Sequence, residues 1–219
     1  MTLMYGFVTD TSNPWMYCDF KCGYCYAPEY GQDAIPKIHA LQVRRKFKET
    51  DCIMLCSLGD PYCRNAPEDI NEILLEEIGN SPPETKFLIQ TKNPNGFFDV
   101  TFPKNVILGC TIESNRNYPE ISKAPSQEDR LSIMKCLYKE CKITNAFLIT
   151  IEPILEFDLL PFFNTLIEIH PWMVAIGYDN HHHCLPEPPL EKTLALIEAL
   201  EAAGIKVYRK TLRKAWDEK

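Results

Sequence analysis

Short apolar runs alternate with stretches of helical periodicity along most of the chain. From residue 52 onward, segments rich in Val, Ile, Leu and Phe are separated by segments in which apolar residues recur every three or four positions. This alternation is typical of βα units, in which parallel strands form one sheet and helices cover its outer face. The apolar runs predict strands at Met4–Val8, Cys52–Ser57, Lys86–Gln90, Val106–Ile112, Ala146–Ile151, Met173–Gly177 and Lys206–Arg209.

The periodic stretches predict four helices with recognisable ends. Pro67 and Ser126 are residue types that often begin helices, and Gly204 follows the last periodic stretch as a C-terminal cap. The connection from Asn93 to Lys104 contains two prolines and a glycine and carries little helix signal. The predicted helices are Glu68–Ile78, Gln127–Tyr138, Leu159–Ile169 and Leu190–Ala203.

Seven strands joined by right-handed crossovers predict an α/β fold, an open, partial (β/α) barrel with parallel strands. The length of 219 residues fits a single domain over residues 1–219, with a loop at residues 13–31 and a C-terminal strand and tail at 205–219. Ligands of such sheets bind at the carboxyl ends of the strands. The polar residues that follow each strand are therefore candidates for a functional site.

The charge balance is acidic, with 23 Lys and Arg against 30 Asp and Glu and a net charge of −7. A surface of this sign does not neutralise phosphates, so it disfavours nucleic acid and favours a small-molecule substrate. The first ten residues lack a signal-peptide pattern, and no run of 18 apolar residues indicates a membrane span. We therefore expect the ten cysteines to be reduced thiols in a cytoplasmic protein.

Three cysteines near the N-terminus carry the strongest chemical signal. Cys18, Cys22 and Cys25 form a C-x3-C-x2-C pattern flanked by aromatic residues. A structural zinc site closes its tetrahedron with four protein ligands, whereas a 4Fe-4S cluster held by three thiolates leaves one iron open to another ligand. The triplet therefore predicts metal binding by these cysteines, and a 4Fe-4S cluster fits their number.

The run from Asn13 to Ala27 resembles the signature of radical S-adenosylmethionine (SAM) enzymes, which have a (β/α)6-type radical SAM barrel. The resemblance implies that the open iron binds SAM and that an electron, from a donor such as flavodoxin or ferredoxin, cleaves SAM to a 5′-deoxyadenosyl radical. The subgroup it most resembles contains spore photoproduct lyase and its smaller relatives. Later segments match that subgroup in order: Ser57–Tyr62, Thr91-Lys92, Glu113 and Glu152-Pro153.

The resemblance also implies roles in binding SAM. The segment Ser57–Asp60 is expected to accept hydrogen bonds from the SAM amine, and Arg130 to bind the SAM carboxylate. At Gly59-Asp60 the sequence departs from the two glycines and a glutamate that many radical SAM enzymes carry.

The remaining strand-end residues suit other parts of SAM and the substrate. Glu113 and Ser114 suit the ribose hydroxyls, and Tyr24 or Tyr26 could stack against adenine or shield the cluster. The expected cofactor-binding residues are Tyr24, Tyr26, Ser57, Gly59, Asp60, Lys92, Glu113, Ser114, Arg130 and Glu152, and the expected substrate-binding residues are Asn13, Asp179, Asn180, His181 and Arg209.

The small relatives in the subgroup suggest a reaction. They include the queuine lyases of bacterial queuosine salvage, which release a 7-aminomethyl-7-deazaguanine base from queuine, and the chain is similar to them in size and motif order. The resemblance implies a lyase acting on a small, deazapurine-like base whose N1–H and amino edge is recognised by Glu or Asp. Two alternatives stay open: a lyase or repair enzyme for a nucleic-acid lesion, and a non-enzymatic zinc or iron-sulfur module with a fourth ligand such as His39 or Cys63.

The run His181-His182-His183-Cys184 follows the sixth predicted strand and contains the ligand types of a soft divalent metal site. Adjacent histidines on an extended backbone cannot all face one metal. We therefore expect a solvated loop, or contact of one histidine with the substrate.

Overall fold

Seven parallel strands form the centre of the computed structural model, which describes residues 4–42, 46–98 and 100–218. The strands lie in one sheet in chain order, so that β1 (Asp10–Ser12) and β7 (Lys206–Arg209) are its edges. This arrangement confirms the predicted α/β fold with parallel strands. The strands between the edges are β2 (Cys52–Leu55), β3 (Lys86–Thr91), β4 (Val106–Thr111), β5 (Ala146–Ile151) and β6 (Met173–Ile176).

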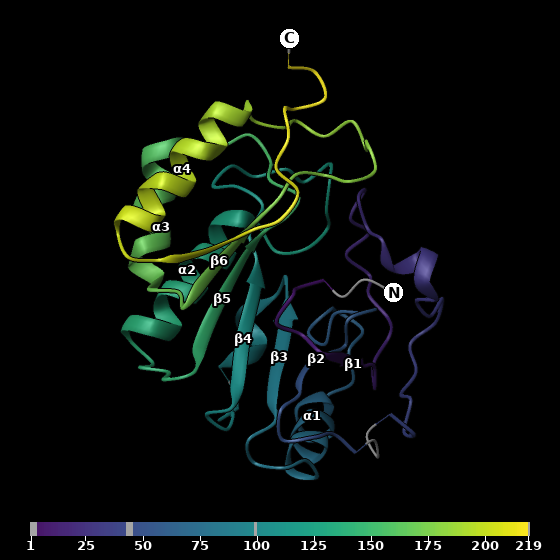
Figure 1. Ribbon diagram of the computed structural model, residues 1–219. Helices are drawn as coiled ribbons and strands as arrows, with labels where there is room; N and C mark the ends of the chain where they lie inside the picture. The colour runs from purple at the N-terminus through teal and green to yellow at the C-terminus, as the bar shows by residue number, and fades with distance from the viewer. Residues whose placement is uncertain (1–3, 43–45, 99, 219) are drawn as a thin grey trace.

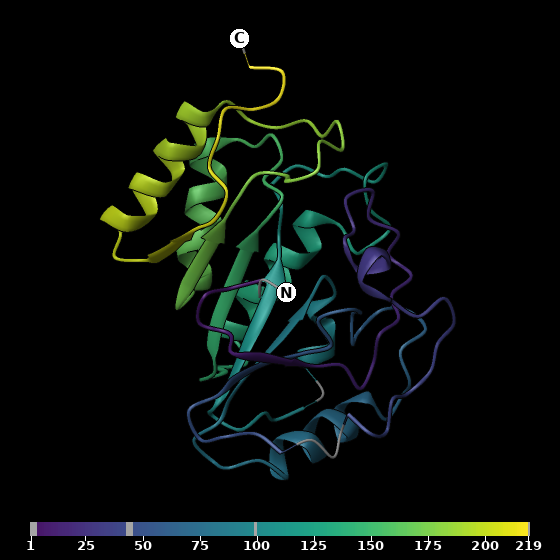
Figure 2. The ribbon, with the colours of Figure 1, turned by 45° about the vertical axis from the view of Figure 1, so that its right-hand side comes forward.

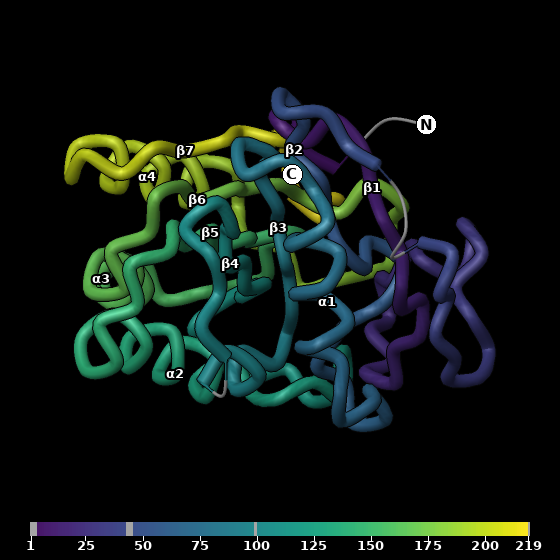
Figure 3. Tube along the Cα trace, turned by 90° about the horizontal axis from the view of Figure 1, so that it is seen from below, coloured from purple at the N-terminus to yellow at the C-terminus, as the bar shows by residue number. Residues whose placement is uncertain are grey.

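Helices stand outside the curved sheet, as the view from below shows (Figure 3). In the described residues, the connections from β1 to β2 and from β3 to β4 carry only the 3₁₀ turns η1 (Ala27–Tyr30) and η2 (Pro94–Phe97). No helix of the described part has the length and apolar character needed to cross a membrane. The α-helices are α1 (Ile70–Gly79), α2 (Gln127–Lys139), α3 (Leu159–Ile169) and α4 (Leu190–Ala202).

Strands β2 to β7 contribute to two cores, because successive side chains point to opposite faces of a sheet. Ile53 and Leu55 of β2 belong to the larger core, which contains the buried faces of the helices. Cys52 and Met54 belong to a smaller core on the inner face of the barrel. Both cores lie along the strands, so that the carboxyl ends of the strands are available for a functional site.

The first strand is not where the apolar pattern predicts it. The prediction of a strand at Met4–Val8 is wrong, since β1 is Asp10–Ser12 and pairs Asp10 with Ile53 of β2. Tyr5 and Val8 instead pack in the inner core, where Tyr5 is completely buried. Figure 2 shows this N-terminal segment crossing the face of the sheet opposite the helices. Its apolar residues fill the barrel rather than extend the sheet.

Candidate active site

A cavity of about 370 Å³ lies at the carboxyl ends of the strands. The cysteine loop (residues 13–31), purple to blue in Figure 1, forms one side, and the residues that follow β5, β6 and β7 form the other. Four expected site residues do not line it, namely Glu113, Ser114, Arg130 and Arg209. The structure brings together Asn13, Cys18, Cys22, Tyr24, Cys25, Tyr26, Ser57, Gly59, Asp60, Lys92, Glu152, Asp179, Asn180 and His181.

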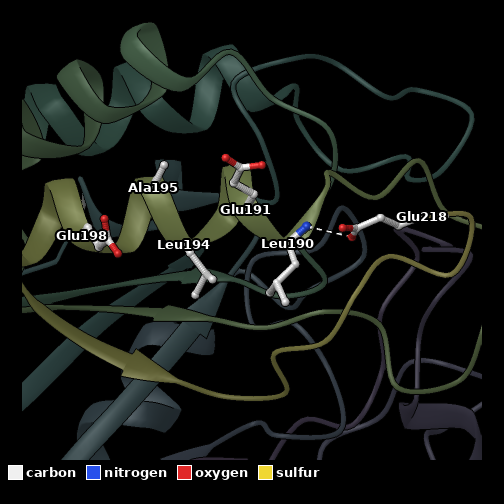
Figure 4. A pocket seen from close by; sticks show the side chains of 6 residues that line it. All are labelled: Leu190, Glu191, Leu194, Ala195, Glu198 and Glu218. Carbon is white, nitrogen blue, oxygen red and sulfur yellow. Dashed lines mark hydrogen bonds between the residues drawn. The ribbon is translucent and has the colours of Figure 1, made fainter.

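A second hollow, of about 460 Å³, lies beside α4 and away from the strand ends. Figure 4 shows Glu218 of the C-terminal tail accepting a hydrogen bond of 3.0 Å from the backbone N–H of Leu190. Aliphatic and acidic side chains line this hollow, and none of the expected site residues is among them. The cavity at the strand ends is therefore the candidate active site.

The three cysteines of the loop are free thiols that share this cavity. Burial raises the pKa of Cys18 and Cys25, and the nearby Cys22 raises both further. In the described residues, no three His, Cys, Asp or Glu side chains are grouped so that they could hold a metal ion. The donor set nevertheless consists of three soft sulfur atoms facing one cavity, which suits an iron-sulfur cluster better than a hard cation.

Neither expected fourth ligand lines the cavity. His39 Nε2 lies 2.5 Å from the Asp33 carboxylate, and the Cys63 thiol is buried and faces the carbonyl of Tyr17 at 3.8 Å. Neither side chain therefore supports the alternative of a zinc module with four protein ligands.

Gly59 lets the cysteine loop lie directly on the end of β2. A Cβ at Gly59 would come within 2.7 Å of the Tyr17 carbonyl oxygen and 2.8 Å of the Tyr17 nitrogen. The adjacent Asp60 N–H donates to the same carbonyl at 3.1 Å, and Trp15 Nε1 donates to the Asp60 carbonyl at 3.0 Å. Because backbone meets backbone here, any side chain at position 59 would push the loop away.

The Asp60 carboxylate joins the ends of β2 and β3. It accepts hydrogen bonds from Thr91 Oγ1 at 2.6 Å and from the backbone N–H of Lys92 at 2.8 Å and of Tyr62 at 3.0 Å. Burial raises the pKa of Asp60 despite these donors. The carboxylate of Asp60 thus fixes the segment whose backbone contacts the cysteine loop. The expected contact of Asp60 with the SAM amine remains a prediction.

Glu113, at the end of β4, is the centre of a buried ion-pair network beside the cavity. Its carboxylate accepts hydrogen bonds from Lys92 Nζ at 2.6 Å and from Arg130 Nη1 at 2.8 Å. Gln127 Nε2 donates at 2.6 Å, and the Tyr24 hydroxyl donates to Oε1. Burial opposes ionisation of Glu113, but Arg130 and Lys92 outweigh it and hold its pKa well below the usual range.

This network links the wall of the cavity to α2. Tyr24 and Lys92 line the cavity, and the Lys92 ammonium lies 5.1 Å from the centre of the Tyr24 ring. Arg130 is 2% exposed and also donates to the carbonyls of Thr111 and Pro125. The network holds Tyr24 between Cys22 and Cys25, while the expected contact of Arg130 with a SAM carboxylate remains a prediction.

Hydrogen bonds within the chain also hold other expected cofactor residues. Asn13 Oδ1 accepts from Ser57 Oγ at 3.1 Å and from the Leu58 N–H at 3.0 Å, and the Tyr26 hydroxyl donates to the Ser57 carbonyl at 2.6 Å. Ser114 Oγ donates to the carbonyl of Glu156 at 2.7 Å, away from the cavity lining.

The far side of the cavity is built by the residues after β6. Asp179 accepts hydrogen bonds from the N–H groups of His181 and His183 and from the ring of His183 at 2.8 Å. Burial opposes ionisation of Asp179, but these donors outweigh it and lower its pKa. His181 lines the cavity, whereas His182 stacks on Trp216. The rings of His181 and His183 contact each other, with centres 5.8 Å apart, whereas the ring of His182 lies against Trp216.

Two consecutive basic residues at the end of β7 point in opposite directions, and only one of them enters the site. Arg209, expected to bind substrate, points outward and pairs with Glu201 of α4 at 2.9 Å, so that prediction is corrected. The next residue, Lys210, lines the cavity and pairs with Glu152. The period of two along a strand requires this alternation, but the sequence alone does not fix which residue faces inward.

Sequence reasoning missed a polar layer inside the barrel. Tyr5, which is completely buried, has its hydroxyl 2.7 Å from both Gln90 Oε1 and Thr150 Oγ1. Gln90 Nε2 donates to Thr111 Oγ1 at 3.0 Å, and Gln90, Thr111 and Thr150 line the cavity. The available signal was a polar residue within an otherwise apolar strand, repeated in β3, β4 and β5.

Solved structures of other proteins share this fold. SuiB of Streptococcus suis bound to the precursor peptide SuiA matches with a TM-score of 0.60 and 12% identity over 93% of this chain. SuiB bound to S-adenosylmethionine matches with a TM-score of 0.59 and 13% identity over 94% of this chain. Both structures are of SuiB, which has a radical SAM barrel-like fold. The fold is that of the radical SAM enzymes.

A third match extends the radical SAM likeness. HydG, a maturase of the [FeFe]-hydrogenase, gives a TM-score of 0.56 and 11% identity over 96% of this chain. The chain spans 49% of the peptide-bound SuiB structure, 50% of the SAM-bound one and 54% of HydG. No family model and no curated protein matches the sequence. The likeness is therefore one of fold, with the cysteine loop at the strand ends of a radical SAM barrel.

Proposed function

We propose that this protein is a radical SAM enzyme in which Cys18, Cys22 and Cys25 hold a 4Fe-4S cluster. The observation that carries the proposal is that these three thiols share a cavity at the strand ends of a radical SAM fold. When bound, a cluster with three protein thiolates offers an open iron to SAM and supplies the electron for its reductive cleavage. The structure of SuiB bound to S-adenosylmethionine supports SAM as the cofactor.

The chain's own residues keep the reactants in fixed positions. The backbone of Gly59 and Asp60 holds the cysteine loop at the end of β2, and the Glu113 network fixes Tyr24 beside the cysteines. Tyr26, anchored on the Ser57 carbonyl, lines the same side of the cavity. A rigid wall of this kind orients the substrate hydrogen and limits access of water.

The finer proposal is a lyase of the spore photoproduct lyase-like subgroup that acts on a small modified nucleobase such as queuine and releases a 7-aminomethyl-7-deazaguanine base. A cavity of about 370 Å³ is of the size used for small ligands. A net charge of −7 disfavours the alternative, a nucleic-acid lesion as substrate, because an acidic protein repels the phosphate backbone. A flavodoxin or ferredoxin would deliver the electron.

Anaerobic reconstitution tests the cluster and SAM chemistry. Wild-type protein with iron and sulfide is expected to take up about four of each per chain and, with dithionite and SAM, to form 5′-deoxyadenosine. Cys22→Ala is expected to lose both properties, whereas Cys184→Ala, an exposed thiol outside the cavity, is expected to keep both. Zinc at one atom per chain, or no 5′-deoxyadenosine from the wild type, would contradict the proposal.

A separate assay tests the substrate. Queuine is expected to bind the SAM-loaded protein, to increase 5′-deoxyadenosine formation and to yield a 7-aminomethyl-7-deazaguanine base detected by mass spectrometry. If queuine has none of these effects while single-stranded DNA or tRNA binds in a salt-dependent way, the alternative of a nucleic-acid lesion is favoured.

A further inference from the structure

We propose that Glu152, which the sequence suggested as a cofactor-binding residue, instead forms with Lys210 a subsite for the polar edge of the substrate. This subsite takes a neutral, planar heterocycle with a carbonyl beside an N–H group. The edge of guanine-type bases has this arrangement. The proposal relies on the proposed function for the reaction, whereas the binding preference is argued from the cavity itself.

The first support is the position of this pair. Glu152 follows β5 and Lys210 follows β7, and both line the cavity with their side chains joined by an ion pair. Each side chain is 15% exposed. In a second ion pair at the cavity wall, between Lys92 and Glu113, the carboxylate is only 1% exposed. Of these two pairs, only Glu152 and Lys210 can present both an acceptor and a donor to a ligand.

The second support is that the pair is held in place before any ligand binds. A Cβ at Gly177 would lie 2.9 Å from Lys210 Cβ and 3.2 Å from Glu152 Oε1, so the glycine makes room for both side chains. The Lys210 ammonium lies 4.9 Å from the centre of the Tyr5 ring. The Tyr5 hydroxyl is anchored by Gln90 and Thr150. Preorganised groups lose less entropy when a ligand binds.

The third support is hydrogen-bonding capacity. An ammonium has three donors and a carboxylate has about four acceptor positions, so their mutual contact leaves capacity on both. A guanine-type edge places its carbonyl against the ammonium of Lys210 and its ring N–H and amino group against the carboxylate of Glu152. An adenine-type edge would instead turn a ring nitrogen lone pair toward the carboxylate. The pair should therefore distinguish the two edges.

The fourth support is the charge balance of the lining. Lys92 is paired with Glu113, Lys210 is paired with Glu152, and the carboxylates of Asp60 and Asp179 accept hydrogen bonds within the chain. Among the described residues of the lining, no lysine or arginine is left unpaired to receive a phosphate. A neutral ligand adds hydrogen bonds without breaking a pair, whereas an anion must compete with a carboxylate.

Calorimetry with defined bases tests the subsite on reconstituted, SAM-loaded protein. Wild type is expected to bind 7-deazaguanine at least roughly tenfold more tightly than 7-deazaadenine, because the weaker ligand leaves polar groups mismatched. Addition of a 5′-phosphate, as in 7-deazaguanosine monophosphate, is expected to weaken binding. Equal affinity for the two bases would overturn the proposal.

Variants separate recognition from folding. Glu152→Gln is expected to lose roughly 10- to 100-fold in affinity for 7-deazaguanine and to bind 7-deazaadenine better than the wild type, since an amide can donate to its ring nitrogen. Lys210→Met should also weaken 7-deazaguanine binding. Arg209→Ala, the outward-facing neighbour, is the matched control and should bind as the wild type does. Loss in Arg209→Ala equal to that in Lys210→Met would contradict the assignment.

The readouts distinguish failure of this inference from failure of the proposed function. Formation of 5′-deoxyadenosine by wild type, without a preference for 7-deazaguanine, would overturn the subsite alone. A clear preference for 7-deazaguanine, without any SAM cleavage, would overturn the proposed radical reaction alone.

Discussion

At the scale of single residues, Glu113 shows how the fold keeps a buried charge. An ionised carboxylate away from water is costly unless it is paired and hydrogen-bonded. Here Arg130 and Lys92 supply the opposite charges, and Gln127 and Tyr24 donate further hydrogen bonds. The sequence identified Glu113 and Lys92 as strand-end residues, but their pairing depends on distances between strands that are far apart in the chain.

Removing one member of this network is expected to be costly. Arg130→Met should lower the free energy of unfolding by about 3–5 kcal/mol, because Glu113 then keeps a buried charge with less compensation. Urea denaturation measures this change. Arg116→Met, which removes an exposed partner of Asp158, is the control and should change stability far less. Equal effects of the two variants would contradict a buried network.

The network also predicts a pH dependence. The pKa of Glu113 is lower in the folded protein than the value of about 4.3 expected for the unfolded chain. Its contribution to stability is therefore fully present above that value and is lost as the pH falls toward the folded-state pKa. Glu113→Gln should be less stable than wild type at pH 7, and the difference should shrink on acidification. A difference that stays constant from pH 7 to pH 3 would contradict this.

At the scale of elements, local pattern identified most helices and strands, and failed where tertiary contacts decide. The predicted ranges of α3, β5 and β7 agree with the structure. α3 and β5 have a strong apolar pattern, and β7 follows Gly204, which ends the preceding helical pattern. β1 is Asp-Thr-Ser and has no apolar signal of its own. The inward direction of Lys210 and the outward direction of Arg209 depend on the register of β7 with β6. Register is a property of the sheet, not of one segment.

The contact between the cysteine loop and β2 gives a test at this scale. Gly59→Ala should lower stability by about 1–3 kcal/mol, because the added methyl group overlaps the backbone of Tyr17. It should also lower iron uptake, since the loop is displaced. Gly79→Ala at the end of α1 is the control, because a Cβ there meets nothing within 4 Å. Thermal melting and iron analysis distinguish the two; normal values for Gly59→Ala would show that the loop adapts.

At the scale of the whole molecule, the N-terminal segment completes the inner core. Tyr5 packs with residues of β2 to β6 on the inner face and anchors Gln90 and Thr150 beneath the cavity. The apolar pattern at Met4–Val8 predicted a strand, but Tyr5 and Val8 are buried inside the barrel without joining the sheet.

Loss of the Tyr5 hydroxyl is expected to weaken the molecule as a whole. Tyr5→Phe should destabilise it by about 1–3 kcal/mol, because a buried hydrogen-bond acceptor loses its partner. Tyr30→Phe, at a position that is 48% exposed, is the control and should leave unfolding by urea unchanged. An unchanged midpoint for Tyr5→Phe would mean that water replaces the hydroxyl.

In a closed barrel the two edge strands would be joined by backbone hydrogen bonds. Here side-chain contacts take their place between β1 and β7. The sheet ends at β1 and β7, and the N-terminal segment connects them through the Gly6 N–H, which donates to the Tyr208 hydroxyl at 2.8 Å, and through the rings of Tyr5 and Phe7 against Tyr208. These contacts lie outside the ladder of hydrogen bonds that joins the strands from β1 to β7. Amide hydrogens near Gly6 should therefore exchange with solvent well before those of β3, β4 and β5, which are held in the centre of the sheet.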